Sequence, residues 1–466
     1  MGDLTADLLT LQRMEMALIR ARLSLPTFLS AREYESLRYI LSFARLNRWA
    51  PLASSAHPPS EMQADPALMT PLRQQVLARL QPALRAPGSA RDRLAACLPS
   101  LETLSTAIRT TRATLLRQQP QTIAAMALDT EVTRKSLVLM PGGGGGAGFV
   151  FVGAFARLQA AGLVPAYVVG ASIGALLGGL YARSRQGDLQ DLLAWGKSLR
   201  AQSIFAPPYM GATRSLPGLL RLHLRALETQ LRHADGTPLR LADLEIPYEA
   251  VVAGLRREGY GKLALPAPGA GGFSARLAGQ LMRVTDYFSP KLLQEIVLGR
   301  EADTRALRVL DAIGLSAAIP GVLQYEPEAR DANSDALLGA LAERHGLIAF
   351  MDGGVIANVP ARVAWEGVQA GRIGTRNAFF LAWDCFHPQW GMGHVWLQPV
   401  TQAVQVQTRA QWPYLDWLTH FTPALSPVNL LPGARQLEQA WQWGWEQTEA
   451  TLPLLQEALR PIDWRP

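Results

Sequence analysis

Cysteine is scarce in this chain, with only Cys97 and Cys385 among 466 residues. Two cysteines so far apart provide neither the disulfide framework of a small secreted domain nor a cysteine-rich metal site. The stretch Met1–Ala6 also lacks the basic region and apolar run of a secretory leader, and Ala6 stands where a myristoylation motif requires serine or threonine. We therefore expect a cytoplasmic protein without a signal peptide, whose contact with membranes is at most peripheral.

Lysine is scarce as well, so arginine supplies most of the basic residues. The 45 basic residues outnumber the 38 acidic ones and give a net charge of +7. No dense basic run is interleaved with aromatic residues, so we expect no binding to nucleic acid. A moderate basic excess suits contact with an anionic membrane surface, and it serves equally well to keep a protein soluble. Composition leaves both interpretations open.

One long uncharged segment raises the question of a membrane span. Leu158–Ala182 runs for 25 residues without a charged side chain, and about 20 apolar residues suffice to cross a bilayer. Pro165 and the glycines of Gly170–Gly174 interrupt any single helix there. We therefore interpret the segment as a strand, a turn and a buried helix, and predict no transmembrane segment.

Three stretches of the chain differ in character. Residues 1–130 show apolar residues at helical spacing, which predicts a helical accessory region. Residues 131–385 alternate strand-like and helix-like segments, which predicts an α/β fold with a mostly parallel central sheet. Nine of the twelve tryptophans lie from Trp383 onward, so residues 386–466 are predicted to be a tryptophan-rich, mostly helical extension. Its rings could anchor the chain on lipid or pack a helical layer onto the core, and we prefer packing.

Within the α/β region, apolar runs bounded by glycine or proline indicate the individual elements. The predicted strands are 136–140, 166–169, 247–255 and 378–383, and the predicted helices are 148–161 and 173–182. Two further stretches, 184–245 and 265–308, are interpreted as helical insertions that cap the site. Ligands of such a sheet bind at the carboxyl ends of its strands.

A glycine run follows the first predicted strand and extends from Gly142 to Gly148, interrupted only by Ala147. A helix that starts directly after it points backbone N–H groups outward with partial positive charge. Glycine also lets a negatively charged oxygen approach without a Cβ in the way. The run therefore predicts an oxyanion hole. Its predicted donors are the amides of Gly143, Gly144, Gly145 and Gly146.

Neighbouring residues disfavour two other ligands for the glycine run. Three of the glycines satisfy the dinucleotide-binding spacing, but that fold needs an acidic residue about 20 positions further on. No aspartate or glutamate occurs between Glu131 and Asp188. A phosphate-binding P-loop requires lysine where Phe149 stands.

The segment Gly170–Gly174 reads Gly-Ala-Ser-Ile-Gly and joins a predicted strand to a predicted helix. This arrangement holds a serine on a sharp turn and exposes its Oγ at the edge of the sheet. Ser172 is therefore predicted to be a nucleophile, and a buried helix N-cap is the alternative role.

Far downstream, Asp352 is followed by Gly353 and Gly354. A carboxylate can serve as the base for a serine hydroxyl when it is desolvated and hydrogen-bonded to Oγ. A lone Asp-Gly-Gly is usually a turn, and only its place in a resemblance to a known family makes Asp352 a predicted base. With that role, Ser172 and Asp352 are the predicted catalytic pair of a serine acyl hydrolase that needs no histidine, metal or other cofactor. The predicted supporting residues of these motifs are Gly148, Gly170, Gly174, Gly353 and Gly354.

The order and flanks of these motifs resemble the patatin-like phospholipase family over roughly residues 134–385. The segments Ser316–Pro320 and Asn358–Pro360 add to the resemblance, whereas Ala147 stands where the family usually has a basic residue. The resemblance implies a patatin-like α/β sandwich. It also implies hydrolysis of fatty acyl esters of phospholipids or lysophospholipids, with Ser172 as the nucleophile and Asp352 as the base.

Two alternatives remain open. A Ser-Asp-His order is available to an ordinary α/β-hydrolase triad, because His387, His394 and His420 follow Asp352. A lipid-binding or regulatory scaffold without activity is the other, and Ala147 is its best support. No metal-ligand spacing is evident, since His387 and His394 are seven residues apart and lack partners.

Overall fold

The computed structural model of the chain describes residues 2–49, 61–118, 122–208, 211, 214–258, 279–280, 291–327, 332–388 and 398–464. Two compact units make up the chain, and neither is a continuous stretch of sequence. Unit 1 comprises residues 1–137, 365–379 and 451–466, and unit 2 comprises residues 138–364 and 380–450. This division differs from the three consecutive regions expected from the sequence, because most of the tryptophan-rich segment belongs to unit 2.

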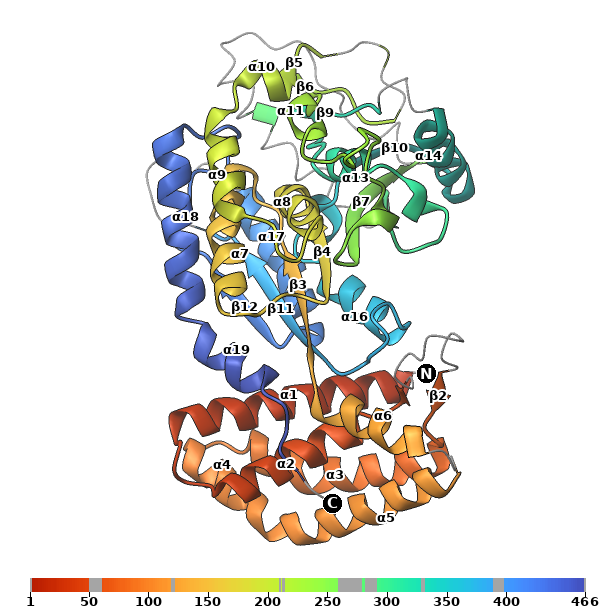
Figure 1. Cartoon of the computed structure of the whole chain (residues 1–466), viewed down its shortest axis with the longest axis vertical. Helices are drawn as coiled ribbons and strands as arrows, with labels where there is room; N and C mark the ends of the chain where they lie inside the picture. Colours follow the sequence, from red (N-terminus) through yellow and green to blue (C-terminus); the bar gives the residue numbers. More distant parts are fainter. Residues whose placement is uncertain are drawn as a thin grey trace. The chain divides into compact units, whose positions relative to one another are not determined.

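Unit 1 is helical, as the apolar spacing of its sequence predicts. Its helices are α1 (Gly2–Ser24), α2 (Ala31–Ala44), α3 (Pro66–Arg85), α4 (Ala90–Cys97), α5 (Leu101–Gln118), α6 (Thr122–Thr133) and α19 (Leu452–Leu459), beside a short pair of strands, β1 (Arg48–Trp49) and β2 (Met62–Gln63). Capping boxes start α2 at Ser30 and α4 at Ser89, where each serine and the acidic residue three positions on bond each other's backbone. Figure 1 shows α1, α2, α3 and α5 side by side, around a core of buried leucine, tyrosine and phenylalanine side chains.

The sheet of unit 2 has the strand order β10-β7-β4-β3-β11-β12, with β8 paired to β7. The strands are β3 (Ser136–Pro141), β4 (Tyr167–Ala171), β7 (Tyr248–Arg256), β8 (Leu293–Leu298), β10 (Leu347–Asp352), β11 (Ala378–Asp384) and β12 (Trp417–His420). The pairs β3–β4, β4–β7 and β11–β12 are parallel, and β8 and β10 are antiparallel to β7. β4 and β11 are buried at every residue, which is the pattern of strands covered on both faces. The predicted α/β fold with a mostly parallel sheet is confirmed.

Most elements predicted near the motifs are present. The four predicted strands correspond to β3, β4, β7 and β11, and the two predicted helices to α7 (Val150–Ala160), which follows the short η2 (Gly145–Phe149), and α8 (Ile173–Ala182). The interpretation of 265–308 as helical is wrong for residues 293–298, which form β8. Residues 265–278 and 281–290 of that stretch lie outside the described residues.

The stretch 184–245 contains both short helices and short strands. Its helices are α9 (Leu189–Ser198), α10 (Ala201–Ile204) and α11 (Arg225–Glu228), and its strands β5 (Phe205–Ala206) and β6 (Leu220–Leu222) form a small sheet with β9 (Leu323–Gln324). The remaining helices of the α/β region and beyond are α13 (Val309–Ser316), α14 (Ala332–His345), α15 (Gly354–Ala357), α16 (Ala361–Gln369), α17 (Gln398–Gln411) and α18 (Ala434–Glu449).

Helix α18, from the tryptophan-rich segment, packs along α7 (Figure 1). The two backbones touch where glycines face them: a Cβ on Gly444 would lie 1.8 Å from the carbonyl oxygen of Val150, and a Cβ on Gly153 would lie 1.9 Å from that of Trp441. This contact supports the packing interpretation for this helix. Trp412, by contrast, is 52% exposed.

The uncharged segment 158–182 forms the end of α7, then β4 and α8, as the interrupting proline and glycines predict. In the part of the chain that the structure describes, no helix combines the length and the apolar character needed to cross a membrane.

Candidate active site

Strand pairing brings the ends of β4 and β10 together on one edge of β7. β8 occupies the other edge. β4 runs parallel to β7 and pairs Ala171 with Val251, whereas β10 runs antiparallel to β7 and pairs Asp352 with Val252. The two strands therefore end head to head, at neighbouring residues of β7. Ser172 follows Ala171 and so meets Asp352, although 180 positions separate them in sequence.

Ser172 lies in the sharp turn between β4 and α8. Its φ of 55° and ψ of −127° form a combination that non-glycine residues rarely adopt, and such strain clusters at functional sites. The turn leaves no room for side chains beside it. A Cβ on Gly174 would lie 2.1 Å from the Pro141 carbonyl oxygen, and a Cβ on Gly170 would lie 2.6 Å from Ala175 Cα. A Cβ would also come within 3.0 Å of a neighbouring atom at the other motif glycines, Gly148, Gly353 and Gly354.

Asp352 is the hydrogen-bond partner of Ser172. The Ser172 hydroxyl donates to Oδ2 of Asp352 at 2.6 Å, and the Gly354 N–H donates to Oδ1 at 2.7 Å. The serine is 5% exposed and the aspartate 4% exposed. Burial raises the pKa of Asp352 to about 7, although both hydrogen bonds oppose the rise. A carboxyl group that titrates near neutral pH can both accept and return a proton.

Ser316, the last residue of α13, links the turns that carry these two side chains. The Ser172 N–H donates to Oγ of Ser316 at 3.0 Å, and the Ser316 hydroxyl donates to the Val251 carbonyl at 2.6 Å. The Gly353 N–H donates to the Ser316 carbonyl at 3.1 Å. From the sequence, Ser316 was only one member of a block of small residues that resembles the family pattern. Its role was not predicted, because the residues that it bonds come from distant parts of the chain.

The glycine run after β3 turns back beside the serine, so that a Cβ on Gly143 would lie 3.1 Å from Cβ of Ser172. Two of the four predicted oxyanion donors already have carbonyl partners. The Gly143 N–H donates to Asn358 at 3.1 Å, and the Gly146 N–H donates to Pro427 at 3.0 Å. These two amides are therefore occupied by the fold itself.

Gly144 and Gly145 keep backbone N–H groups that make no hydrogen bond to any described residue. Their φ values of 156° and 53° favour glycine, and both residues border a cavity that contains Ser172. The predicted set of four donors thus narrows to these two amides. Ala147 is fully buried and does not line the cavity. The chain therefore has no basic side chain at the position where the family pattern usually has one.

Two cavities open at Ser172. The larger measures about 1000 Å³ and the smaller about 690 Å³, including space open to solvent. Leucines of α8 and α9, such as Leu177 and Leu193, line the larger cavity, and no charged side chain of the described residues lines it. Valines of α15 and α17 line the smaller cavity, which also contains Asp352 and Asn358. Both cavities therefore suit hydrocarbon chains.

Asn358 contributes an unpaired amide to the smaller cavity. The residue is 3% exposed, and its Nδ2 has no hydrogen-bond partner among the described residues. Leaving a buried N–H unpaired costs about 1–3 kcal/mol. A polar group bound in the cavity would remove this cost. From the sequence, Asn358 was only part of the segment Asn358–Pro360 that resembles the family pattern, and no role in binding or catalysis was predicted for it.

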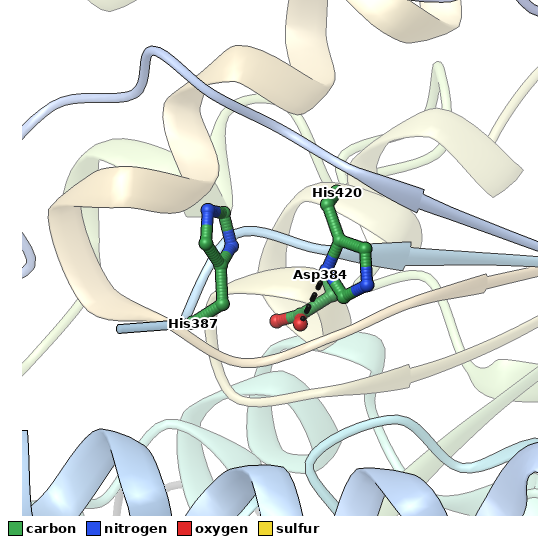
Figure 2. Close-up of side chains that lie close together, drawn as sticks. All are labelled: Asp384, His387 and His420. Carbon is green, nitrogen blue, oxygen red and sulfur yellow. Dashed lines mark hydrogen bonds and ion pairs between the residues drawn. The ribbon is translucent and has the colours of Figure 1, made fainter. Parts of the chain in front are cut away.

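Histidine does not approach Ser172 in the part of the chain that the structure describes. No described histidine bonds its hydroxyl or lines either cavity. His394, one of the three triad candidates, lies outside the described residues. The other two, His387 and His420, lie beside Asp384 instead (Figure 2).

The expectation that His387 lacks partners is therefore wrong. β11 and β12 place Asp384 opposite His420 in register, and Nδ1 of His420 lies 3.0 Å from Oδ2 of Asp384. Burial favours a higher pKa for Asp384, but hydrogen bonds from His420, Gln405 and Phe386 outweigh it and lower that pKa.

Comparison with known proteins gives a family for the region that contains this site. Residues 139–365 match the family model described as patatin-like phospholipase. The match runs from β3 into α16 and so includes the glycine run, Ser172 and Asp352. A comparison with curated proteins gave no match. Residues 139–365 are therefore a patatin-like phospholipase domain, and lipid acyl hydrolysis is the activity that this family implies.

Proposed function

We propose that the chain hydrolyses fatty acyl esters of phospholipids or lysophospholipids, with Ser172 as the nucleophile and Asp352 as the only side-chain base. The observation that carries this proposal is the 2.6 Å hydrogen bond between the two side chains, made in a nearly closed site where two apolar cavities meet.

Acylation begins when Oγ of Ser172 attacks the ester carbonyl carbon and its proton passes to Oδ2 of Asp352. The carbonyl oxygen becomes an oxyanion, which the amides of Gly144 and Gly145 bind. Each such donor contributes about 3–4 kcal/mol to the transition state. The intermediate then collapses, the alcohol leaves with the proton from Asp352, and the acyl group stays on Ser172.

Deacylation repeats the steps with water. Asp352 takes a proton from a water molecule, whose oxygen attacks the acyl carbon. The second oxyanion occupies the same two amides. Collapse releases the fatty acid and returns the proton to Ser172. A pKa of about 7 suits both steps, because Asp352 must accept and release one proton in acylation and another in deacylation.

The cavities support a lipid as the substrate. The larger cavity holds an acyl chain next to Ser172, and the smaller one holds the apolar part of the leaving alcohol. No cationic side chain of the described residues lines either cavity, so a phosphate head group is expected to remain outside them.

Contact with a lipid surface is part of the proposal. α17 lines the smaller cavity with Val400 and Val404, whereas Val406 of the same helix is 68% exposed and Trp412, directly after it, is 52% exposed. An exposed valine on this helix and an exposed tryptophan just after it suit peripheral binding to a membrane, which the net charge of +7 favours when the lipid is anionic.

A panel of phospholipids, lysophospholipids and short-chain esters tests the proposal through the fatty acid released. Ser172→Ala and Asp352→Asn should each reduce turnover by roughly three orders of magnitude, and the double variant should be little worse, because the pair acts as a unit. Exchange of His387, His394 or His420 should leave most activity. Loss of turnover in a folded histidine variant would favour the triad, and an inactive wild-type chain would favour a scaffold.

A further inference from the structure

A second cluster of polar side chains lies at the carboxyl ends of β11 and β12. Asp384 ends β11 and is fully buried, and His420 ends β12 directly beside it. Nδ1 of His420 lies 3.0 Å from Oδ2 of Asp384. The cluster is not part of the Ser172 site, which uses a different carboxylate.

His387 completes the cluster. The Phe386 N–H donates to Oδ1 of Asp384 at 2.9 Å, which turns the chain back after β11. The ring of His387 then lies against that of His420, with centroids 5.3 Å apart. Nε2 of His387 bonds the Thr422 hydroxyl, while its Nδ1 is buried and has no partner among the described residues. Figure 2 shows that this second nitrogen lies on the side of the ring that faces Asp384 and His420.

We propose that Asp384, His387 and His420 form a binding site for a divalent transition-metal ion with the ligand preferences of zinc. One carboxylate oxygen and two imidazole nitrogens are a common donor set for such ions, and water would fill the remaining position. One ligand atom from each residue already lies within 4.8 Å of the other two. Tetrahedral zinc needs donors about 3.4 Å apart, so a small rotation of the His387 ring closes the site.

The surrounding contacts are those that hold metal ligands in place. When Nε2 of His387 donates to Thr422, Nδ1 carries the free lone pair that a metal requires. Gln405 Nε2 donates to Oδ2 of Asp384 at 2.8 Å and fixes the carboxylate. A bound cation would take the place of the proton between His420 and Asp384, and the single ring proton of the neutral imidazole would then sit on Nε2 of His420.

A metal here would brace the glycine run rather than enter the acyl transfer. Cys385 and Phe386 lie between the cluster and the run. A Cβ on Gly144 would lie 2.5 Å from Sγ of Cys385 and 3.3 Å from Cβ of Phe386. Linking the ends of β11 and β12 would therefore fix the wall against which Gly144 packs.

Calorimetric titration of ZnCl2 into the chelator-treated, desalted full-length chain tests the site. We expect one equivalent to bind, and His420→Ala and His387→Ala to weaken binding by more than about 100-fold, since even the loss of a supporting residue costs about 10–100-fold. His420→Ala is the principal variant because that side chain is 44% exposed and its loss leaves no cavity in the core. Co²⁺ should give visible absorption bands in the wild type and none in this variant.

His233→Ala is the matched control. His233 pairs with Asp243 at 3.2 Å on the surface, without a third ligand among the described residues, and its loss should leave zinc affinity unchanged. Wild type that binds zinc no more tightly than His420→Ala overturns the proposal, and so does an equal loss in His233→Ala. Binding is measured without any ester, so an inactive hydrolase and a missing metal site give separate results.

Discussion

The buried carboxyl group of Asp352 should make the protein less stable as the pH rises from 5 to 7. An aspartate in the unfolded chain titrates near 3.8 and is ionised throughout this range, whereas the folded protein keeps the proton until about pH 7. The folded state therefore binds more protons than the unfolded state, and the free energy of unfolding falls by up to about 1.4 kcal/mol for each pH unit. The slope is halved at pH 7, where half of the folded molecules are ionised, so the loss between pH 5 and 7 is about 2.3 kcal/mol.

Asp352→Asn removes this titration and isolates its effect. Urea unfolding of both proteins at pH 5, 6, 7 and 8.5 gives the difference in their free energies of unfolding, from which the other titrating groups cancel. We expect the wild type to lose about 2.3 kcal/mol relative to the variant between pH 5 and 7, and about 0.4 kcal/mol more up to pH 8.5. The wild-type kcat/KM for a soluble ester should rise about fiftyfold between pH 5 and 7, as the base ionises.

Asp335→Asn is the control of opposite sign, because its partner Arg214 does not titrate in this pH range. The hydrogen bond from Arg214 lowers the pKa of Asp335 in the folded state, so its contribution is present above the unfolded pKa and is lost only as the pH falls through the lower folded value. The stability difference between wild type and this variant should be flat from pH 5 to 8.5. A flat difference for Asp352→Asn as well would refute the claim that burial keeps this carboxyl protonated near neutrality.

Three further substitutions test the loop, the cavity and the helix packing. Gly144→Ala should lower kcat by about two to three orders of magnitude, because a Cβ would displace Cys385 and move a proposed oxyanion donor. Gly187→Ala is the control and should leave kcat unchanged, because its Cβ would meet its nearest neighbour at 3.6 Å. Equal kcat in the two variants would contradict a role of the glycine run in the mechanism. Asn358→Ala should reduce kcat/KM by about tenfold or more through loss of its free amide, and an unaltered kcat/KM in steady-state assays would count against a role in substrate binding. Gly444→Ala should destabilise the protein by about 1–3 kcal/mol in urea, because α18 must move away from α7; unchanged stability would contradict the packing of the tryptophan-rich segment.

Local sequence patterns predicted the strands and helices whose formation depends mainly on neighbouring residues in the chain. β3 and β4 are short apolar runs that end in glycine motifs, and α8 follows Ser172 without a break, so periodicity and turn chemistry were sufficient. β8, β10 and β12 were not predicted. Each is short, and β8 and β10 exist because they pair with β7 from distant positions in the chain. An apolar run before Asp352 was the available signal for β10.

The candidate residues Ser172 and Asp352 follow from motifs, but the choice of the two candidate oxyanion donors required the structure. The sequence treats Gly143 to Gly146 alike, and only the positions of the Asn358 and Pro427 carbonyls distinguish the occupied amides from the free ones. The Asp384 cluster was missed for a similar reason. Asp384 and His420 are 36 positions apart, and they meet only because β11 and β12 pair in parallel with these two residues in register.

Labelling with a fluorophosphonate tests the central claim most directly, because the reagent forms a covalent bond only with an activated serine. The account predicts one adduct in the folded wild type, mapped by peptide mass spectrometry to Ser172. The adduct should be absent in Ser172→Ala, and it should form far more slowly in Asp352→Asn and in the wild type at pH 5. Folded wild type that stays unlabelled at pH 8, or an adduct on another serine, would contradict the account.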